Sequence, residues 1–335
     1  MTIKDISRET GYSIGTISRV LNNHPNVSEQ ARKTIMEVVE KRGFVLNASA
    51  KSLKQQSSAN IIVIVKGTSN ELFANLVEQI QLNFMSTKYN VIVEYIDEEG
   101  NEVERARQLS LDKKPQGFLF LGGNIENFVK EFAKLDLPSV LVTNRGRELG
   151  FGNLSSVTTD DQAAARCAVD YLLSQGHKKV ALLGGYAGSD VGRARRKGWI
   201  EAHANHHIEE KDMAPFIEGR FSFKAGYQGM EKLLDSGEKI TAVFAVADVM
   251  AVGAISAITD RGLRVPEDIS VLGFDGLELG EYVCPKLTTI VQDVELIAKR
   301  SCKLLRDYIE EKGSAKHEMV GFSLKCRQSV KYLGE

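Results

Sequence analysis

From residue 61 onward, short runs of β-branched and aromatic residues alternate with segments of helical pattern. The apolar runs span 61–65, 91–95, 118–121, 140–142, 180–183, 242–246 and 269–274, and helical patterns among them include 71–85, 162–174 and 249–261. Nearly continuous apolar strands separated by helices are typical of parallel sheets covered on both faces. Because about 275 residues are many for one open sheet, we expect two α/β lobes with a ligand cleft where strand ends meet.

The first 60 residues have a different, purely helical pattern. Thr2 and Asp5 stand in capping-box positions for a first helix, Ser13 can cap a second over 14–21, and a third begins after Ser28. The apolar face of the second helix is expected to consist of Ile14, Ile17, Val20 and Leu21. A helix, a glycine-containing turn, a second helix and a supporting helix are typical of a helix-turn-helix unit.

Charge is unevenly distributed along the chain. Residues 1–60 contain nine Lys and Arg against five acids, a net charge of +4, whereas residues 61–335 carry −5. A basic head on an acidic body indicates a module that binds a polyanion. The sequence shows no apolar run long enough for a membrane span, no apolar signal segment, and four cysteines with no C-x-x-C pair. We therefore expect a cytoplasmic protein without membrane attachment, disulfides or a zinc site.

Two patterns that suggest chemistry are better explained by structure. Residues 11–15 match the G-x-S-x-G nucleophile elbow, but no strand precedes them, so Ser13 is interpreted as a helix cap. His203, His206 and His207 have helical spacing, but they lack an H-E-x-x-H glutamate and have polar neighbours. We therefore predict no catalytic residue, no metal site and no cofactor.

The string Thr16-Ile17-Ser18-Arg19-Val20-Leu21-Asn22, at this distance from the N-terminus, closely resembles the opening of the lactose/galactose repressor (LacI/GalR) family. The resemblance continues along the chain in family order. Its further motifs are Asn47-x-x-Ala50-Lys51-Ser52-Leu53, Arg195-x-x-Gly198-Trp199, Gly273-Phe274-Asp275 and Arg327-Gln328-Ser329. Departures include Leu46, Glu71, Gly67 and Ala247, where the family often has Pro, Pro, Asp and Asn.

The resemblance implies a homodimer whose paired heads read a pseudo-palindromic operator in double-stranded DNA. In that arrangement the second helix lies in the major groove and the hinge helices enter the minor groove. The DNA-binding residues that it implies are Ile14, Gly15, Thr16, Ser18, Arg19, Asn22, Asn26, Ala50, Lys51 and Leu53. Leu53 is an isolated large apolar side chain in a polar linker, which suits a wedge between base steps.

The resemblance also implies a small-molecule effector, a sugar or a nucleoside, in the cleft between the lobes. The effector-binding residues that it implies are Phe73, Asp160, Arg195, Phe221, Asp275 and Gln292. An arginine facing a carboxylate across the cleft would supply both donors and acceptors to ligand hydroxyls, and the aromatic rings would stack on a sugar or a base.

These observations predict an all-α helix-turn-helix head followed by a two-lobed α/β body like that of periplasmic binding proteins. The expected limits are a DNA-binding domain at 1–46, a hinge at 47–59 and a body at 60–335. The expected first lobe covers about 60–160 and 292–320, and the second about 161–291 and 321–335. The function is a ligand-responsive transcriptional regulator, a repressor, without enzyme activity. The alternatives are a sugar-transport binding protein, an α/β enzyme, and a global regulator with a protein co-repressor.

Overall fold

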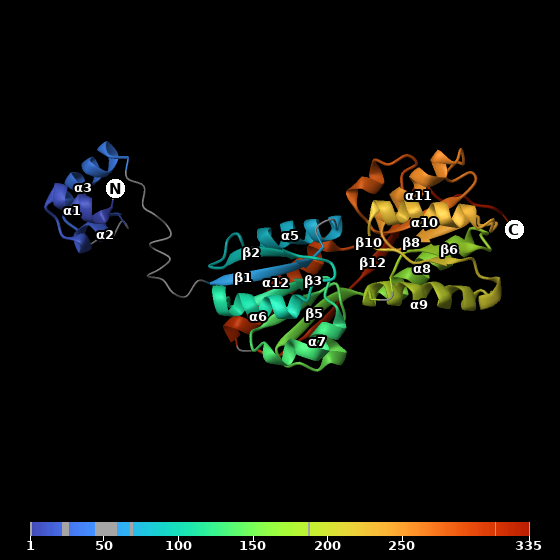
Figure 1. Ribbon diagram of the computed structural model, residues 1–335, viewed down its shortest axis with the longest axis horizontal. Coiled ribbons are helices and arrows are strands. Elements are labelled where there is room, and N and C mark those ends of the chain that lie inside the picture. The colour runs from blue at the N-terminus through green and yellow to red at the C-terminus, as the bar shows by residue number, and fades with distance from the viewer. Residues whose placement is uncertain are drawn as a thin grey trace. The chain divides into compact units, whose positions relative to one another are not determined.

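The computed structural model describes residues 2–21, 27–43, 59–67, 70–186, 188–311 and 313–334. The chain divides into two compact units, Met1–Ser58 and Ala59–Glu335, called here the head and the body (Figure 1). The predicted hinge helix and its residues Ala50, Lys51 and Leu53 lie outside the described residues.

The described part of the head consists of α1 (Ile3–Thr10), α2 (Ile14–Leu21) and α3 (Glu29–Lys41). The predicted capping box is confirmed, because the Thr2 side chain accepts from the Asp5 backbone N–H and the Asp5 carboxylate accepts in return. The Ser13 hydroxyl caps α2 by accepting the Thr16 backbone N–H at 3.2 Å. Both caps satisfy N–H groups that the first helical turn leaves without partners.

The three helices enclose a small core of Ile6, Ile17, Val20 and Ile35. Ile14 does not join this core, although the helical pattern predicted it on the apolar face of α2. Its side chain is 48% exposed, because it lies in the first turn of α2, beyond the surface that α1 and α3 cover.

The body contains two six-stranded sheets among its described residues, and helices cover both faces of each (Figure 1). The first sheet has the order β11 (His317–Val320), β5 (Leu154–Thr159), β4 (Ser139–Val142), β3 (Gly117–Leu121), β1 (Asn60–Lys66), β2 (Asn90–Ile96). The second has the order β12 (Phe322–Lys325), β10 (Thr288–Gln292), β9 (Ser270–Asp275), β8 (Ala242–Ala245), β6 (Val180–Leu183), β7 (Phe216–Ile217). Every pairing is parallel except that of β12 with β10.

The helices that cover the sheets are α5 (Glu71–Phe84), α6 (Glu102–Lys113), α7 (Ile125–Glu131), α8 (Asp161–Ser174), α9 (Asp190–Asn205), α10 (Phe223–Asp235), α11 (Asp248–Asp260) and α12 (Val294–Glu311). Short 3-10 turns lie at η1 (Phe132–Lys134), η2 (Arg147–Leu149), η3 (Glu210–Asp212) and η4 (Glu278–Glu281). None of the helices in the described ranges is long and apolar enough to cross a membrane.

The continuous apolar sequence of β1 follows from its position between two helical layers. Ile61, Val63 and Val65 pack in the same cluster as the inner residues of α5 and α12, whereas Ile62 and Ile64 pack with those of α6 and α7. Because alternate side chains of a strand point to opposite faces, a central strand covered on both sides needs an apolar residue at every position.

The chain crosses between the sheets three times among the described strands, after β5, after β10 and between β11 and β12. The helix that follows β10, α12, packs on β3, β4 and β5 of the first sheet. Each lobe is therefore built from two separate stretches of the chain.

Candidate functional site

The outward surface of α2 carries the residues expected to read DNA. Ile14, Gly15 and Arg19 are exposed, and Thr16 and Ser18 are half-buried between that surface and the core. The remaining predicted contacts, Asn22, Asn26, Ala50, Lys51 and Leu53, lie outside the described residues. The described part of the head thus presents an apolar, a hydroxyl and a cationic side chain on one helix.

A cavity of about 340 Å³ in the body is lined by residues of both lobes. It lies where strands of the two sheets end, because its walls include Lys66 at the end of β1, Asn144 after β4, Tyr186 after β6 and Asp275 at the end of β9. Ligands of parallel α/β folds bind at the carboxyl ends of strands for the same topological reason.

The structure brings four of the six predicted effector residues to this cavity, namely Phe73, Arg195, Phe221 and Asp275. Two others do not line it. Asp160 instead caps α8, accepting the Ala163 N–H at 3.1 Å and the Arg145 guanidinium at 2.6 Å. Gln292 lies behind the wall, where its amide donates to the Asp275 carboxylate at 2.8 Å and so orients it.

The expectation that Arg195 and Asp275 face each other across the cleft is wrong, because both residues belong to the second lobe. The Asp275 carboxylate lies 3.6 Å from Arg195 Nη1, and the main partner of Arg195 is Asp161. Arg195 Nε and Nη2 approach Asp161 Oδ1 at 2.9 and 2.8 Å, and the guanidinium stacks on the Phe274 ring at 3.6 Å. These contacts hold the guanidinium in one orientation at the cavity wall.

Burial controls the protonation of the carboxyl groups around Arg195. Desolvation raises the pKa of Asp275 to about 7, although the Arg195 charge acts in the opposite direction. Desolvation likewise raises the pKa of Asp161. Near neutral pH, Asp275 can therefore donate as well as accept a hydrogen bond, which suits a ligand hydroxyl group.

Asp248 lies behind Asp275 and does not line the cavity. Its carboxylate accepts the Thr289 hydroxyl at 2.5 Å and the Leu277 N–H at 2.7 Å. Burial, followed by the nearby Asp275 charge, raises its pKa to about 8. It supports the end of β9 from within the second lobe.

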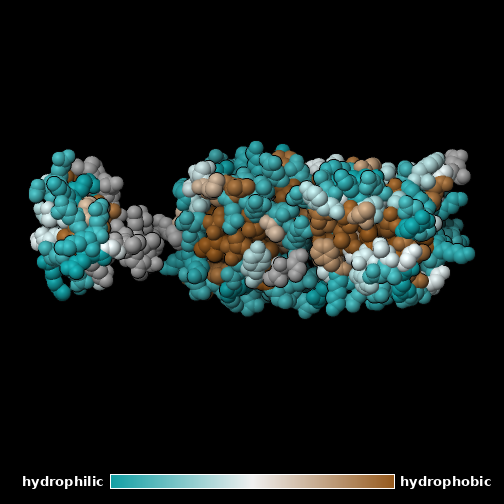
Figure 2. All heavy atoms as spheres, turned by 90° about the horizontal axis from the view of Figure 1, so that it is seen from above, coloured by the Kyte–Doolittle hydropathy of each residue, from teal (hydrophilic) through white to brown (hydrophobic). Residues whose placement is uncertain are grey.

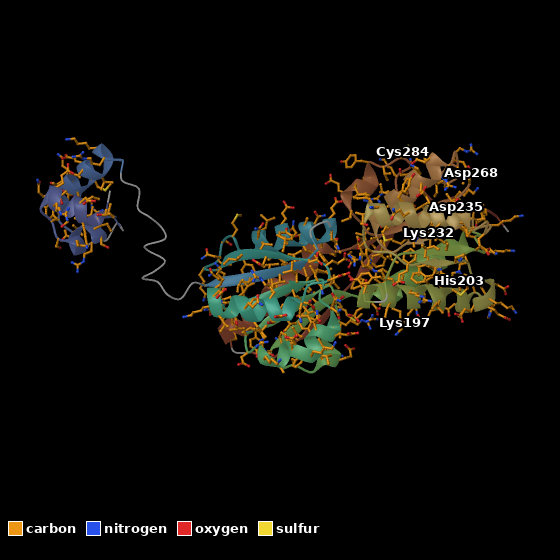
Figure 3. The ribbon with its side chains drawn as sticks, viewed as in Figure 1. Lys197, His203, Lys232, Asp235, Asp268 and Cys284 are labelled. Atoms are coloured by element: carbon orange, nitrogen blue, oxygen red, sulfur yellow. The ribbon has the colours of Figure 1, made fainter. Side chains whose placement is uncertain are left out.

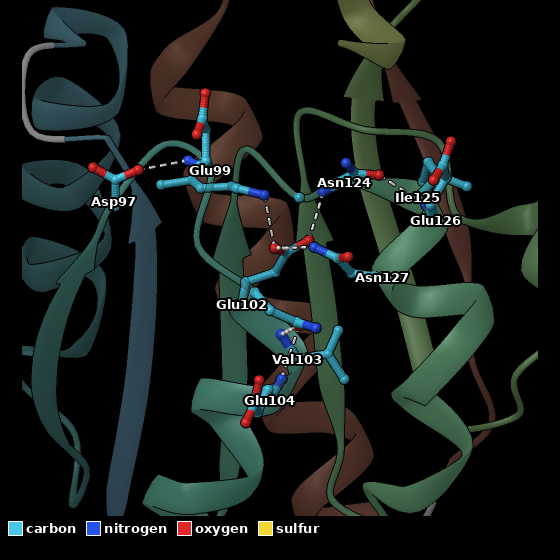
Figure 4. A network of polar contacts seen from close by, with 12 residues as sticks. Asp97, Glu99, Glu102, Val103, Glu104, Asn124, Ile125, Glu126 and Asn127 are labelled. Carbon is cyan, nitrogen blue, oxygen red and sulfur yellow. Dashed lines mark hydrogen bonds and ion pairs between the residues drawn. The ribbon is translucent and has the colours of Figure 1, made fainter. Parts of the chain in front are cut away.

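Sequence reasoning missed a buried ion pair in the first lobe, Lys66 with Glu102. Lys66 Nζ lies 2.9 Å from Glu102 Oε2, and the two side chains are 8% and 2% exposed. Glu102 also accepts the Asn124 backbone N–H at 2.5 Å and the Asn127 amide at 3.0 Å (Figure 4). The one signal in the sequence was a lysine directly after the apolar run 61–65.

Among the described residues, polar contacts connect the lobes at two places beside the cavity. Arg220 of the second lobe pairs with Glu98 at 3.5 Å and with Glu99, both in the first lobe. The Ile125 backbone N–H donates to the Asp190 carboxylate at 3.2 Å.

Two of the three histidines with helical spacing have separate structural partners. His203 lies on α9 in the second lobe (Figure 3), where its Nδ1–H donates to the Trp199 carbonyl at 2.8 Å. His206 Nε2 lies 3.3 Å from Asp170. The described residues hold no group of three or more His, Cys, Asp or Glu side chains placed to bind a metal.

Comparison with known proteins gives matches over the whole chain. Residues 2–47 match "Bacterial regulatory proteins, lacI family", and residues 169–330 match "Periplasmic binding protein-like domain". The chain is 33% identical to catabolite control protein A of Priestia megaterium, over 99% of each protein.

Many solved structures are similar to this chain in fold and sequence. One is the Lac repressor dimer bound to operator and the anti-inducer ONPF, with a TM-score of 0.80, 26% identity and 99% of each chain covered. Another is a LacI family transcriptional regulator from Enterococcus faecium with bound ribose, with a TM-score of 0.73 and 26% identity, covering 82% of this chain and all of that one.

Proposed function

The chain belongs to the lacI family of bacterial regulatory proteins, and we propose that it represses transcription as a homodimer controlled by a sugar or a nucleoside. As a member of this family it is a ligand-responsive, DNA-binding transcriptional regulator. The proposal adds the sign of regulation, the oligomeric state, the class of ligand and the residues that make each contact.

The observation that carries the proposal is the cavity between the lobes. The aromatic residues Phe73, Tyr186 and Phe221 contribute to its walls, together with the polar groups of Arg195 and Asp275. Aromatic faces stack on sugar and base rings, whereas charged donors and acceptors bind hydroxyl groups, so the lining suits a cyclic polyhydroxylated ligand. The E. faecium relative, which holds ribose, supports the same class of ligand.

We infer that Phe73, Arg195, Phe221 and Asp275 contact the effector directly. Gln292 acts through Asp275, and Asp160 acts through the first turn of α8, which carries Asp161. This division follows from the hydrogen bonds that each side chain already makes.

Ile14, Gly15, Thr16, Ser18 and Arg19 are proposed to read the major groove from the outward surface of α2. Arg19 suits phosphate or guanine, and Ile14 suits a thymine methyl group. Asn22, Asn26, Ala50, Lys51 and Leu53 complete the proposed interface, with the last three in the minor groove.

The proposed homodimer is supported by exposed hydrophobic residues on the body. Figure 2 shows hydrophobic residues gathered over the face that carries α5 in the first lobe and α10 and α11 in the second. Leu82 and Met85, at the end of α5, and Tyr95 on the edge strand β2 are each about half exposed or more. Large exposed apolar patches often mark interfaces between proteins.

The proposed domain limits remain 1–46, 47–59 and 60–335, with lobes of 60–160 plus 292–320 and 161–291 plus 321–335. The membership of the two sheets supports these lobes, because β10 and β11 belong to different sheets, as do β11 and β12.

The first test measures DNA binding by fluorescence anisotropy, with duplexes from the control region of the chain's own gene. Affinity should fall steeply with salt, because Lys and Arg contacts release counterions from phosphate. A chain lacking residues 1–57 should lose this binding. Unchanged affinity of that deletion would contradict the assignment of DNA binding to the head.

The second test measures effector binding by calorimetry with Arg195→Ala and Asp275→Ala. Each substitution removes a charged hydrogen-bonding group, which should weaken binding by roughly 1.5–3 kcal/mol. Arg261→Ala is the matched control, because Arg261 is an exposed arginine paired with Asp235 on the surface. Unimpaired binding by both cavity variants would contradict the site. Recovery of the ligand chemically unchanged distinguishes a regulator from an α/β enzyme.

A further inference from the structure

Lys66 and Glu102 form a buried ion pair, and neither residue is among the proposed effector contacts. The Glu102 carboxylate is fully engaged, with Lys66 and Asn127 on one oxygen and the Asn124 N–H on the other. Because both side chains are buried, separating the two charges would leave each without solvation. The network therefore holds the Lys66 ammonium at one place in the wall.

The ammonium still has hydrogen-bonding capacity toward the cavity. It carries three N–H donors and lines the cavity, and Glu102 is its one acceptor among the described residues. Buried donors are normally satisfied by protein, water or ligand. A ligand that presents a hydroxyl or carbonyl oxygen near the end of β1 would satisfy the remaining N–H groups.

The positive charge, by contrast, is already cancelled. The same is true of the other two cations that line the cavity in the described structure. Arg195 is paired with Asp161, and Arg220 with Glu98 and Glu99. Asp97 and Asp275 add carboxyl groups to the lining itself, whereas Asp190 is paired with Arg193.

This arrangement discriminates by ligand charge. An anionic ligand would lose its hydration on entering and would meet no uncompensated cation among the described residues. A neutral hydroxyl group loses little hydration and gains a charge-assisted hydrogen bond from Lys66.

We propose that Lys66 contacts the effector and that Glu102 cancels its charge, so that the cavity binds uncharged sugars and excludes sugar acids and sugar phosphates. The inference rests on the proposed function, because it assumes that the effector occupies this cavity. Lys66 is the specificity-determining donor, and Glu102 is its positioning residue.

The test uses matched pairs of ligands that differ in charge: glucose with glucuronate, galactose with galacturonate, and ribose with ribose 5-phosphate. Calorimetry and thermal shift on the full-length chain give the affinity for each member. In the wild type, at least one neutral sugar should bind, and its acidic partner should bind at least about tenfold more weakly.

Glu102→Gln removes the compensating charge but keeps an oxygen that can accept the Asn124 N–H. The preference for the neutral sugar over its acidic partner should shrink about tenfold or more, because Lys66 becomes an unpaired cation facing the ligand. Lys66→Met combined with Glu102→Gln removes both charges, which avoids a buried unpaired carboxylate. It should weaken binding of the neutral sugar about tenfold or more without improving that of the acid.

Lys179→Met and Glu238→Gln are the controls. Lys179 and Glu238 form an ion pair of similar length, 3.1 Å, but both are well exposed and distant in sequence from the cavity residues of the first lobe. Both variants should keep wild-type affinities for every ligand of the panel.

Three results would overturn the inference. The first is a sugar acid or sugar phosphate whose affinity for the wild type equals that of its neutral partner. The second is an unchanged preference for the neutral sugar in Glu102→Gln. The third is an absence of binding by every neutral sugar of the panel. If the chain nevertheless binds its operator, these results leave its role as a DNA-binding regulator standing. Failure to bind DNA would instead contradict the proposed function.

Discussion

Arg220 Nη1 lies 3.5 Å from the Glu98 carboxylate, and this ion pair joins the second lobe to the first at the cavity wall. Glu99 contacts the same guanidinium, and the Ile125–Asp190 hydrogen bond forms a second link between the lobes. These contacts hold the two lobes together at the cavity wall in the described structure. An effector that favours one closure shifts the population by its difference in affinity for the two states.

We expect Arg220→Ala to favour the open arrangement. The Arg220 side chain is about half exposed, so solvent screens its ion pairs and each of them contributes little. Effector affinity should fall about two- to fivefold, and small-angle X-ray scattering should show a larger radius of gyration without ligand. High salt should reduce the difference between mutant and wild type, because it screens exposed charges. An unchanged radius and affinity would show that the pair does not affect closure.

His177 predicts a specific dependence of stability on pH. It is buried, its Nε2–H donates to the Lys331 carbonyl at 3.2 Å, and its Nδ1 accepts the Thr241 hydroxyl at 3.0 Å. Desolvation lowers its pKa from 6.5 to about 4. Since the folded pKa is depressed, the stability that neutral His177 contributes is present above pH 6.5 and is lost as pH falls toward 4.

The loss should amount to about 3 kcal/mol, because each pKa unit corresponds to about 1.4 kcal/mol. Urea unfolding of wild type and His177→Gln at pH 7, 5.5 and 4 measures it. The variant should be less stable at pH 7 but should lose less stability on acidification. His207→Asn is the control, because His207 is exposed and asparagine tolerates its φ of +58°. Equal acid sensitivity in His177→Gln and wild type would contradict the prediction.

Ile14→Ala should weaken operator binding without unfolding the head. Exposed substitutions usually change stability by less than about 0.5 kcal/mol, and loss of one base contact costs on the order of 1 kcal/mol, or about fivefold in affinity. Ile17→Ala, three residues along the same helix, removes a fully buried side chain and should cost about 2–5 kcal/mol of stability. Anisotropy titration and thermal melting separate the two effects. Wild-type affinity and sequence preference in Ile14→Ala would exclude Ile14 from base reading.

Leu53→Ala should weaken operator binding more than it affects folding. Leu53 lies outside the described residues, and the prediction rests on its isolation in the polar segment 47–60. An apolar wedge offsets the cost of unstacking a base step, so its loss should cost on the order of a few kcal/mol of affinity. Gln55→Ala is a control in the same segment. Equal operator affinity of Leu53→Ala and wild type at fixed salt would refute the wedge.

The sequence predicted strands that are largely apolar, including the edge strand β2, and missed strands rich in polar residues. Strands β1, β3 and β6 were evident because both of their faces are covered. Strand β5 was missed because its sequence Leu-Ser-Ser-Val-Thr-Thr looks exposed, although every residue is buried. The hydroxyl groups of Ser155 and Ser156 make tertiary hydrogen bonds, those of Ser156 with Gly146 and His317, which no local pattern reveals.

Among the residues of the cavity, too, some were predicted from the sequence and others were missed. Phe73, Arg195, Phe221 and Asp275 were reached through family resemblance, by position in a motif. Asp161 and Glu102 were missed as partners of Arg195 and Lys66, because they lie 34 and 36 residues away from them in sequence. Which carboxylate neutralises which cation depends on how strand ends and helix starts meet in space, and periodicity carries no information on that.

The threading of the chain through both sheets has a consequence for synthesis on the ribosome. The first sheet receives its edge strand β11 only after almost all of the second lobe has been made, and the second receives β12 directly afterwards. Neither sheet can therefore be completed until the ribosome has synthesised the last strands of the chain. A stop codon anywhere ahead of β11 leaves both sheets without an edge strand, so a truncated product is a substrate for proteolysis instead of a shorter regulator.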